Sequence, residues 1–234
     1  MGPKVVRSDP AVRAMFDRIA PVYDGMNTLM TAGIDRRWRR AALAAAALRP
    51  GERVLDVATG TGKLARGAAA LVGSTGEVVG LDASARMLAR ARRAGAGVRW
   101  LQADAMAMPL DDRSFDVVTI GFGLRNLPDT EAALHELARM LRPGGRLVVL
   151  EIAEPPHGVA RVLFTTWFRR VVPLLGRLAG QRGAYVYLPE SLRRYPPPDV
   201  VAAQMADAGF EAVTWRWLPT RLATLHVGRR GASS

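Results

Sequence analysis

The chain has 234 residues, of which 49% are hydrophobic and 23% are charged, and it contains no cysteine. This length and composition are typical of one globular domain with a buried core, and they exclude a disordered chain, a disulfide scaffold and a cysteine-based metal site. Lysine and arginine outnumber aspartate and glutamate by 33 to 21, mostly through residues 1–50 and 151–234. This positive charge would suit binding to nucleic acid or to an anionic membrane surface. Arginines that simply face solvent explain it equally well.

Short apolar runs alternate with helical patterns through the middle of the chain. Before them, two helices are predicted at 11–22 and 36–48, the second ended by Pro50 and Gly51. The middle is then predicted to contain strands at 53–57, 76–82, 98–102, 114–120 and 146–151, separated by helices at 63–72, 84–93 and 130–141. An apolar stretch at 159–180 follows, and the chain closes with a helix at 199–208 and strands at 210–218 and 222–227.

This order predicts an α/β fold with a mostly parallel, seven-stranded sheet and helices on both faces. The last two strands are expected to form an antiparallel hairpin. We expect one domain over residues 1–234, made of a helical N-terminal cap at 1–50, a core at 51–154, a helical insertion at 155–195 and a C-terminal helix with strands at 196–234.

Three acidic residues mark the ends of three successive predicted strands. Asp56 precedes the turn Gly60-Thr61-Gly62, in which glycine lets the backbone approach a ligand closely. A dinucleotide site would have a third glycine at position 65, where this chain has alanine, so a nucleoside without pyrophosphate, S-adenosylmethionine, fits better. Asp82 is then expected to accept the ribose hydroxyls, and Asp104 with the Ala105 N–H to bind adenine.

Each of these residues also has a purely structural interpretation. The glycines would suit any tight strand-to-helix turn, Asp82 a helix N-terminus and Asp104 a turn. Their joint placement, in order, is what class I S-adenosylmethionine-dependent methyltransferases with a Rossmann-like fold show. The predicted cofactor-binding residues are Asp56, Gly60, Thr61, Gly62, Asp82, Ala83, Asp104, Ala105 and Gly121.

Several longer stretches point to one family. They are residues 16–27, 121–129 (GFGLRNLPD), 141–151, 185–196 (YVYLPESLRRYP) and 225–228. On these motifs the chain resembles the quinone-biosynthesis C-methyltransferases of the UbiE/MenG type over nearly its whole length. The resemblance implies methyl transfer from S-adenosylmethionine to a ring carbon of a prenylated hydroquinone, such as demethylmenaquinol, in menaquinone or ubiquinone biosynthesis.

That chemistry needs a group that lowers the pKa of a ring hydroxyl. Arg125 and Asn126, in the loop after the fourth strand, are the first candidates, since a fixed cation stabilises a phenolate. A structural salt bridge is the plainer role for Arg125. Tyr185, a third catalytic candidate, and Tyr187 could hydrogen-bond the acceptor oxygen, with packing as their alternative role. His226 is predicted to be a core histidine rather than a base.

The chain also departs from the family's usual residues. Asp35 replaces a common histidine, Lys63 a common aspartate and Ala153 a common serine, and Thr220-Arg221 replaces a usual Gly-Gly pair. These changes leave other acceptors open, namely an aromatic or polyketide substrate of a specialised-metabolite C- or O-methyltransferase. A nucleic-acid methyltransferase and a non-catalytic cofactor-binding subunit are weaker alternatives, because aromatic residues are only 6% and the glycines and acids are intact.

The apolar stretch at 159–180 has three interpretations, since it suits a channel for a prenyl tail, a helix resting on a membrane surface or a helix packed in the core. We expect a cytoplasmic protein without a metal ion or a nucleic acid partner. Peripheral contact with the inner face of a membrane and a homodimer stay open.

Overall fold

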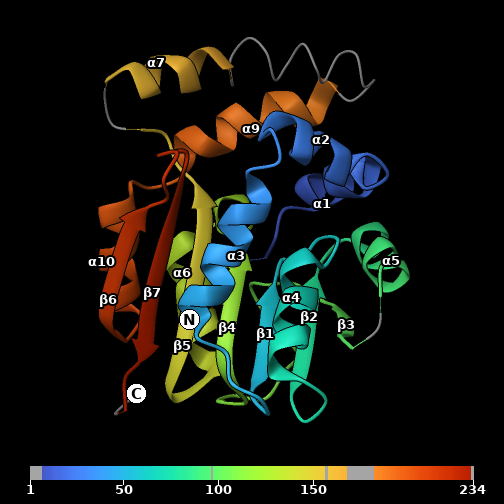
Figure 1. Ribbon diagram of the computed structural model, residues 1–234, viewed down its shortest axis with the longest axis vertical. Coiled ribbons are helices and arrows are strands. Elements are labelled where there is room, and N and C mark those ends of the chain that lie inside the picture. The colour runs from blue at the N-terminus through green and yellow to red at the C-terminus, as the bar shows by residue number, and fades with distance from the viewer. Residues whose placement is uncertain (1–6, 96, 156–157, 168–181, 233–234) are drawn as a thin grey trace, which may run out of the picture.

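The computed structural model describes residues 7–95, 97–155, 158–167 and 182–232. One sheet of seven strands runs through them in the order β3-β2-β1-β4-β5-β7-β6 (Figure 1). β3, β2, β1, β4 and β5 pair in parallel, whereas β7 is antiparallel to both β5 and β6, so the predicted mostly parallel sheet and C-terminal hairpin are confirmed. The strands are β1 Arg53–Val57, β2 Glu77–Asp82, β3 Arg99–Gln102, β4 Phe115–Gly121, β5 Leu141–Ile152, β6 Phe210–Trp217 and β7 Ala223–Arg230.

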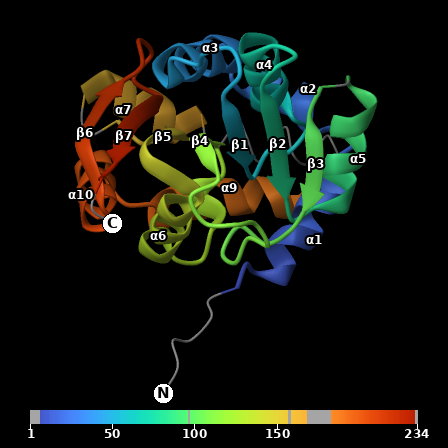
Figure 2. The same ribbon diagram turned by 90° about the horizontal axis from the view of Figure 1, so that it is seen from below.

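Helices pack on both faces of this sheet (Figure 2). One apolar layer joins α3 and α4 to the sheet around Trp38, Leu64 and Val148, and the other joins α6 and α10 around Leu134 and Met205. The two layers follow from strands that are apolar on both faces, as parallel sheets require. The helices are α1 Pro10–Ile19, α2 Tyr23–Met30, α3 Asp35–Ala46, α4 Lys63–Val72, α5 Ala85–Arg93, η1 Leu124–Asn126, α6 Thr130–Met140, α7 Gly158–Thr166, α9 Arg182–Arg194 and α10 Pro198–Asp207.

A separate group of helices covers the carboxyl ends of the parallel strands. α1, α2 and α9 lie across this end, and α7 lies beyond α9 (Figure 1). Leu188 and Leu192 of α9 pack against Met26 and Met30 of α2. Open α/β sheets bind ligands at this end, so these helices lie where a ligand would be covered. In the described part of the chain, no helix has both the length and the apolar character that crossing a membrane requires.

Three boundaries differ from the sequence-based prediction. The helix predicted at 11–22 ends at Ile19, and a second helix, α2, begins at Tyr23. Pro21, which has no N–H to donate, lies between α1 and α2. β5 begins at Leu141 rather than at 146, because Leu141 pairs with Phe115 across an irregular stretch that accommodates the Pro-Gly-Gly segment. α9 lies within the predicted helical insertion at 155–195, but its bounds were not predicted and it contains Pro189.

Candidate active site

The main cavity opens at the carboxyl ends of β1, β2 and β4. It encloses about 700 Å³ of space, part of which is open to solvent, and its walls are mostly apolar. α1 and α2 close one side, and the strand ends form the other. Of the predicted residues it is lined by Gly60, Asp82, Ala83, Ala105, Gly121 and Asn126, and further by Ser8, Asp9, Val12, Arg13, Phe16, Tyr23, Ala58, Leu81, Ser84, Met87, Phe122, Gly123 and Leu127.

Asp82 ends β2 at the wall of the main cavity. Its two carboxylate oxygens accept hydrogen bonds from the backbone N–H groups of Gly60 and Ser84, each at 2.8 Å. Burial raises the pKa of Asp82, and the two N–H groups oppose that shift. A carboxylate offers about four acceptor sites, so Asp82 can still accept hydroxyl groups from a ligand.

The turn after β1 brings its backbone to the cavity. Gly60 has a φ of 57° and Gly62 a φ of 77°, and a Cβ on Gly62 would lie only 2.2 Å from the Trp100 ring. Gly62 is therefore required by packing, whereas Gly60 and Thr61 border a smaller, polar cavity next to the main one. The N-terminus of α4 begins in this turn, which favours an anionic group there.

Asp56 lies beneath the turn rather than in the main cavity. It is 1% exposed, and its carboxylate accepts hydrogen bonds from Thr59 at 2.6 Å and Thr119 at 2.7 Å. Burial raises the pKa of Asp56 to about 6, although both hydroxyls oppose the shift. These bonds fix the end of β1 to the neighbouring strand β4, so Asp56 shapes the turn.

The raised pKa of Asp56 predicts a pH-dependent stability. In the unfolded chain the group ionises near its ordinary pKa of 3.8, and in the folded protein near 6. The folded state therefore holds the proton more tightly, and stability is lost as pH rises between these values, by up to about 3 kcal/mol. We expect Asp56→Asn to be more stable than the parent protein at pH 7 and to lose this advantage at pH 4. Urea unfolding at both pH values measures it, and an equal difference at the two would contradict the assignment.

Asp104, which follows β3, is held by the N-terminal segment. It accepts hydrogen bonds from the N–H of Ser8 at 2.9 Å, from the Ser8 hydroxyl and from the N–H of Met106 at 2.9 Å. Burial works toward a higher pKa, but these bonds outweigh it and lower the pKa of Asp104. The neighbouring Ala105 lines the main cavity, while Asp104 borders a second opening beside it.

Three further contacts tie the N-terminal helices to the site. The Ser84 hydroxyl donates to Asp17 of α1 at 2.6 Å. Asp24 of α2 accepts from the Thr61 hydroxyl at 2.9 Å and pairs with Lys63 at 2.9 Å. Although burial opposes the shift, Lys63 and Thr61 lower the pKa of Asp24. Lys63, which differs from the family's usual residue, thus pairs with the helix that covers the site.

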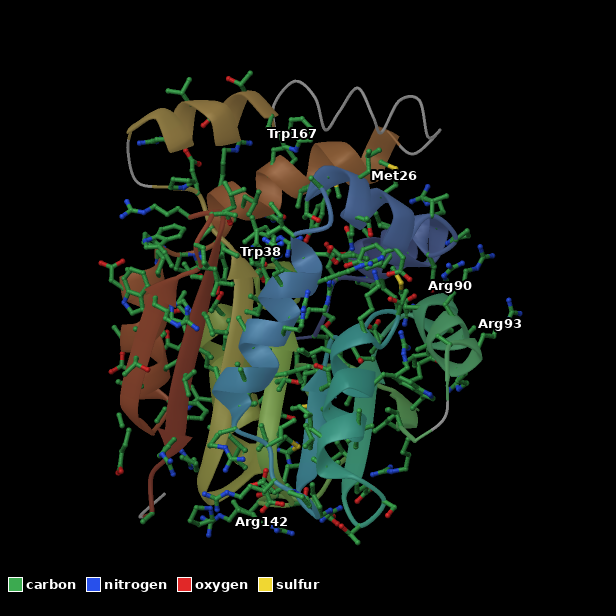
Figure 3. All side chains as sticks on the ribbon, viewed as in Figure 1. Met26, Trp38, Arg90, Arg93, Arg142 and Trp167 are labelled. Atoms are coloured by element: carbon green, nitrogen blue, oxygen red, sulfur yellow. The ribbon has the colours of Figure 1, made fainter. Side chains whose placement is uncertain are left out.

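A second cavity, which we call the acceptor cavity, adjoins the main one. It has about 430 Å³ of space, and Tyr23 and Phe122 border both cavities. Trp38 of α3, labelled in Figure 3, forms part of the wall of the acceptor cavity. The acceptor cavity is lined by Tyr23, Asn27, Met30, Thr31, Asp35, Trp38, Arg39, Phe122, Arg125, Ile152 and Leu188.

Arg125 reaches this cavity from a buried ion pair. Its Nη1 donates to Glu151 Oε1 at 2.8 Å and to the Phe122 carbonyl at 2.6 Å. The backbone N–H of Arg125 donates to Glu151 Oε2 at 3.2 Å. Glu151, at the end of β5, is fully buried, and burial raises its pKa against the opposing effect of Arg125. The Nε of Arg125 and the Oδ1 of Asn126 are buried without a hydrogen-bond partner in the described residues. Asn126 lines the main cavity and Arg125 the second one.

The remaining candidates differ in position. The side chain of Tyr185 lies outside the described residues, whereas Tyr187 is half-buried, with a pKa raised by burial and opposed by Arg125. His226 is fully buried in β7, where its Nε2 lies 2.9 Å from the Pro198 carbonyl and its ring stacks on Trp215. Burial lowers the pKa of His226, consistent with the predicted core histidine. Tyr23, expected from sequence in an N-terminal lid over the cofactor, borders both cavities. The sequence prediction missed Glu151 as the partner of Arg125.

The donors and acceptors of the main cavity fit S-adenosylmethionine. Asp82 offers acceptors for ribose hydroxyls, while Met87, Leu127 and Ala105 offer an apolar surface for adenine. The Oδ1 of Asn126 accepts no hydrogen bond from the described residues, and a donor group on the ligand would supply one. At the other end, the polar turn before α4 suits the carboxylate of the amino acid portion.

Comparison with known proteins decides between the families that share this fold. The model of the ubiE/COQ5 methyltransferase family matches residues 4–230. The chain belongs to the ubiE/COQ5 methyltransferase family. It is 49% identical over 221 residues to the demethylmenaquinone methyltransferase of Thermus thermophilus, covering 92% of this chain and 100% of that protein. It is 42% identical over 224 residues to the ubiquinone/menaquinone biosynthesis C-methyltransferase UbiE of Ectopseudomonas mendocina, covering 93% and 88%.

Solved structures with low sequence identity share the fold. The [4+2]-cyclase SpnF has a TM-score of 0.72 at 18% identity and covers 98% of both chains. A possible histamine N-methyltransferase from Thermotoga maritima has a TM-score of 0.65 at 21% identity and covers 94% of this chain and 99% of its own. The predicted class I fold is confirmed, and this ubiE/COQ5 family member is an S-adenosylmethionine-dependent methyltransferase.

Proposed function

We propose that the protein methylates a ring carbon of a prenylated hydroquinone, with demethylmenaquinol as the preferred acceptor. The observation that carries this proposal is the aromatic and apolar acceptor cavity, bordered by the Arg125 guanidinium and joined to the main cavity at Tyr23 and Phe122. The relatives named for demethylmenaquinone and ubiquinone/menaquinone methylation support the same acceptor class.

In this proposal the main cavity holds S-adenosylmethionine. Asp82 and Ala83 contact the ribose, Asp104 and Ala105 the adenine, and the segment Gly60–Gly62 and Gly121 lie beside the amino acid portion, with Asp56 supporting the turn from below. When bound, S-adenosylmethionine supplies an electrophilic methyl group on a sulfonium. The residues that surround it orient it and exclude water, which accounts for much of the rate in such transfers.

Arg125 is proposed to act on the acceptor. A ring carbon is a weak nucleophile until the adjacent hydroxyl loses its proton, and a buried guanidinium lowers the pKa of that hydroxyl by stabilising the phenolate. Glu151 and the Phe122 carbonyl hold the guanidinium in place. Asn126, and Tyr185 on α9, are proposed to complete the hydrogen bonds around the acceptor oxygen.

Mass spectrometry of the methylated product tests this function. Purified protein, S-adenosylmethionine and a short-chain demethylmenaquinol are incubated without oxygen, beside an unprenylated naphthol and the oxidised quinone. The proposal predicts methylation of the reduced, prenylated ring and none of the quinone, which has no hydroxyl to ionise. Efficient methylation of the naphthol with no reaction of the prenylated ring would replace the proposal with a smaller aromatic acceptor.

A prenylated acceptor partitions into membranes, and we propose that α7 and α2 rest on an anionic bilayer. Val162 of α7 is 65% exposed and Leu29 of α2 is 53% exposed, and the Trp167 indole donates to the Met30 carbonyl at 3.2 Å, which joins these two helices. Figure 3 shows Trp167 and Met26 at the same end of the molecule. The excess of basic residues in the chain would strengthen such contact.

Vesicle flotation tests the membrane proposal. We expect the protein to float with vesicles that contain anionic lipid and to remain below zwitterionic ones. Val162→Glu should reduce flotation several-fold, because it places a charge in the apolar contact. Val200→Glu on α10, where the parent valine is 41% exposed, is the matched control and should float like the parent. Equal flotation of the two variants would contradict the proposal.

A further inference from the structure

A buried ion pair lies in the wall of the acceptor cavity. Asp35, the first residue of α3, is only 2% exposed, and Arg39 donates to its carboxylate from the next turn of the helix. The Thr31 hydroxyl lies 3.3 Å from it but donates its only proton to the Asn27 carbonyl at 2.7 Å, so Arg39 is the main donor to Asp35. Because a carboxylate has about four acceptor sites, Arg39 leaves Asp35 with capacity for another hydrogen bond.

Asp35 and Arg125 enter the acceptor cavity from different parts of the fold. Asp35 belongs to α3, whereas Arg125 belongs to the short helix η1 after β4. Aromatic groups complete the wall, since the rings of Trp38 and Phe122 lie 6.1 Å apart. The cavity therefore combines an apolar surface for a flat ring with a donor group, Arg125, and an acceptor group, Asp35.

A hydroquinone has two hydroxyls on opposite sides of its ring, and they need different partners. The hydroxyl beside the reacting carbon needs a hydrogen-bond donor, because it becomes a phenolate. The other hydroxyl keeps its proton and needs an acceptor. An ionised carboxylate can only accept hydrogen bonds, so it binds a hydroxyl and not an ether oxygen or a carbonyl.

We propose that Asp35 accepts a hydrogen bond from this second hydroxyl and so determines which edge of the ring faces the methyl donor. Asp35 is then a specificity-determining residue, and Arg39 balances the charge of its carboxylate. The inference rests on the proposed function. A site built to bind a hydroxyl discriminates strongly against an analogue that lacks it, because the buried carboxylate is left unpaired.

A comparison of two acceptors tests the role of Asp35. One is a short-chain demethylmenaquinol, and the other is the same compound with the hydroxyl beside the prenyl carbon converted to a methyl ether. We expect the parent protein to prefer the diol by about 10- to 100-fold in kcat/KM. In Asp35→Ala this preference should fall to near one, mainly through a higher KM for the diol. Asp35→Asn, which preserves the shape, should retain part of it.

Arg39→Ala is the matched control, because it breaks the same ion pair and leaves the Asp35 carboxylate in place. If Asp35 binds the hydroxyl, this variant keeps a clear preference for the diol. If Asp35 serves only to pair with Arg39, Asp35→Ala and Arg39→Ala lose the same fraction of activity on the diol and on the methyl ether. Both variants then keep the parent's preference for the diol, and this result would overturn the inference. An equal kcat/KM of the parent protein on both acceptors would also overturn it and leave the proposed function intact. Absence of methylation of the diol by the parent protein would overturn the proposed function itself.

Discussion

Arg125→Ala is expected to lower kcat/KM for methyl transfer by about 100- to 10,000-fold while leaving the affinity for S-adenosylhomocysteine within a few-fold of the parent. The substitution removes the cation that we propose to stabilise the phenolate, and single groups of this kind contribute effects of this size. It also leaves Glu151 buried without its partner, so we expect a loss of about 3–5 kcal/mol in the free energy of unfolding. Steady-state kinetics, calorimetric binding and urea unfolding measure the three quantities.

A double variant separates catalysis from folding. Arg125→Met with Glu151→Gln removes both buried charges and keeps an oxygen that can accept from the backbone N–H groups of Arg125 and Ile152, so little stability should be lost. We expect the double variant to fold as stably as the parent and to remain as inactive as Arg125→Ala. Activity restored together with stability would assign Arg125 a structural role alone.

Asp82→Ala is expected to weaken binding of S-adenosylhomocysteine by about 100-fold or more. The substitution removes the charged acceptor that we propose for two ribose hydroxyls, and it also releases the N–H groups of Gly60 and Ser84 that the carboxylate now holds. Isothermal titration calorimetry measures the change directly.

Asp111→Ala is the matched control for Asp82→Ala, because Asp111 is exposed in the loop before β4 and lies outside the lining of the main cavity. Its affinity for S-adenosylhomocysteine should equal that of the parent. Asp82→Asn keeps one oxygen acceptor and is expected to fall between the two. A Kd for Asp82→Ala that matches the control would remove Asp82 from the cofactor site.

The parts of the site that sequence could predict are those set by local pattern. Asp82 and Ala105 follow apolar strands, and the ends of neighbouring parallel strands meet at one edge of the sheet, so their presence at the main cavity follows from the strand order. The Gly60 turn follows from the same rule. The Ser84 cap of α5 was also predictable, since serine precedes the helix and its side chain accepts from Met87.

The parts that sequence could not predict depend on contacts between distant segments. Ser8 reaches Asp104 and Asp17 reaches Ser84, and neither pairing has a local signature. The pairing of Arg125 with Glu151 had only a weak local signature, namely an acidic residue at the end of an apolar strand. Only the pairing of β4 with β5, in which Gly121 lies opposite Leu150, brings Glu151 beside the loop that carries Arg125.

The position of the transferred methyl group on the product decides whether the protein is a C-methyltransferase. The protein is incubated with S-adenosylmethionine that carries a deuterated methyl group and a short-chain demethylmenaquinol, and the product is analysed by mass spectrometry and deuterium NMR. The account predicts one deuterated methyl group on the free ring carbon next to a hydroxyl. A deuterated methyl ether, with the ring carbon still bearing hydrogen, would contradict it.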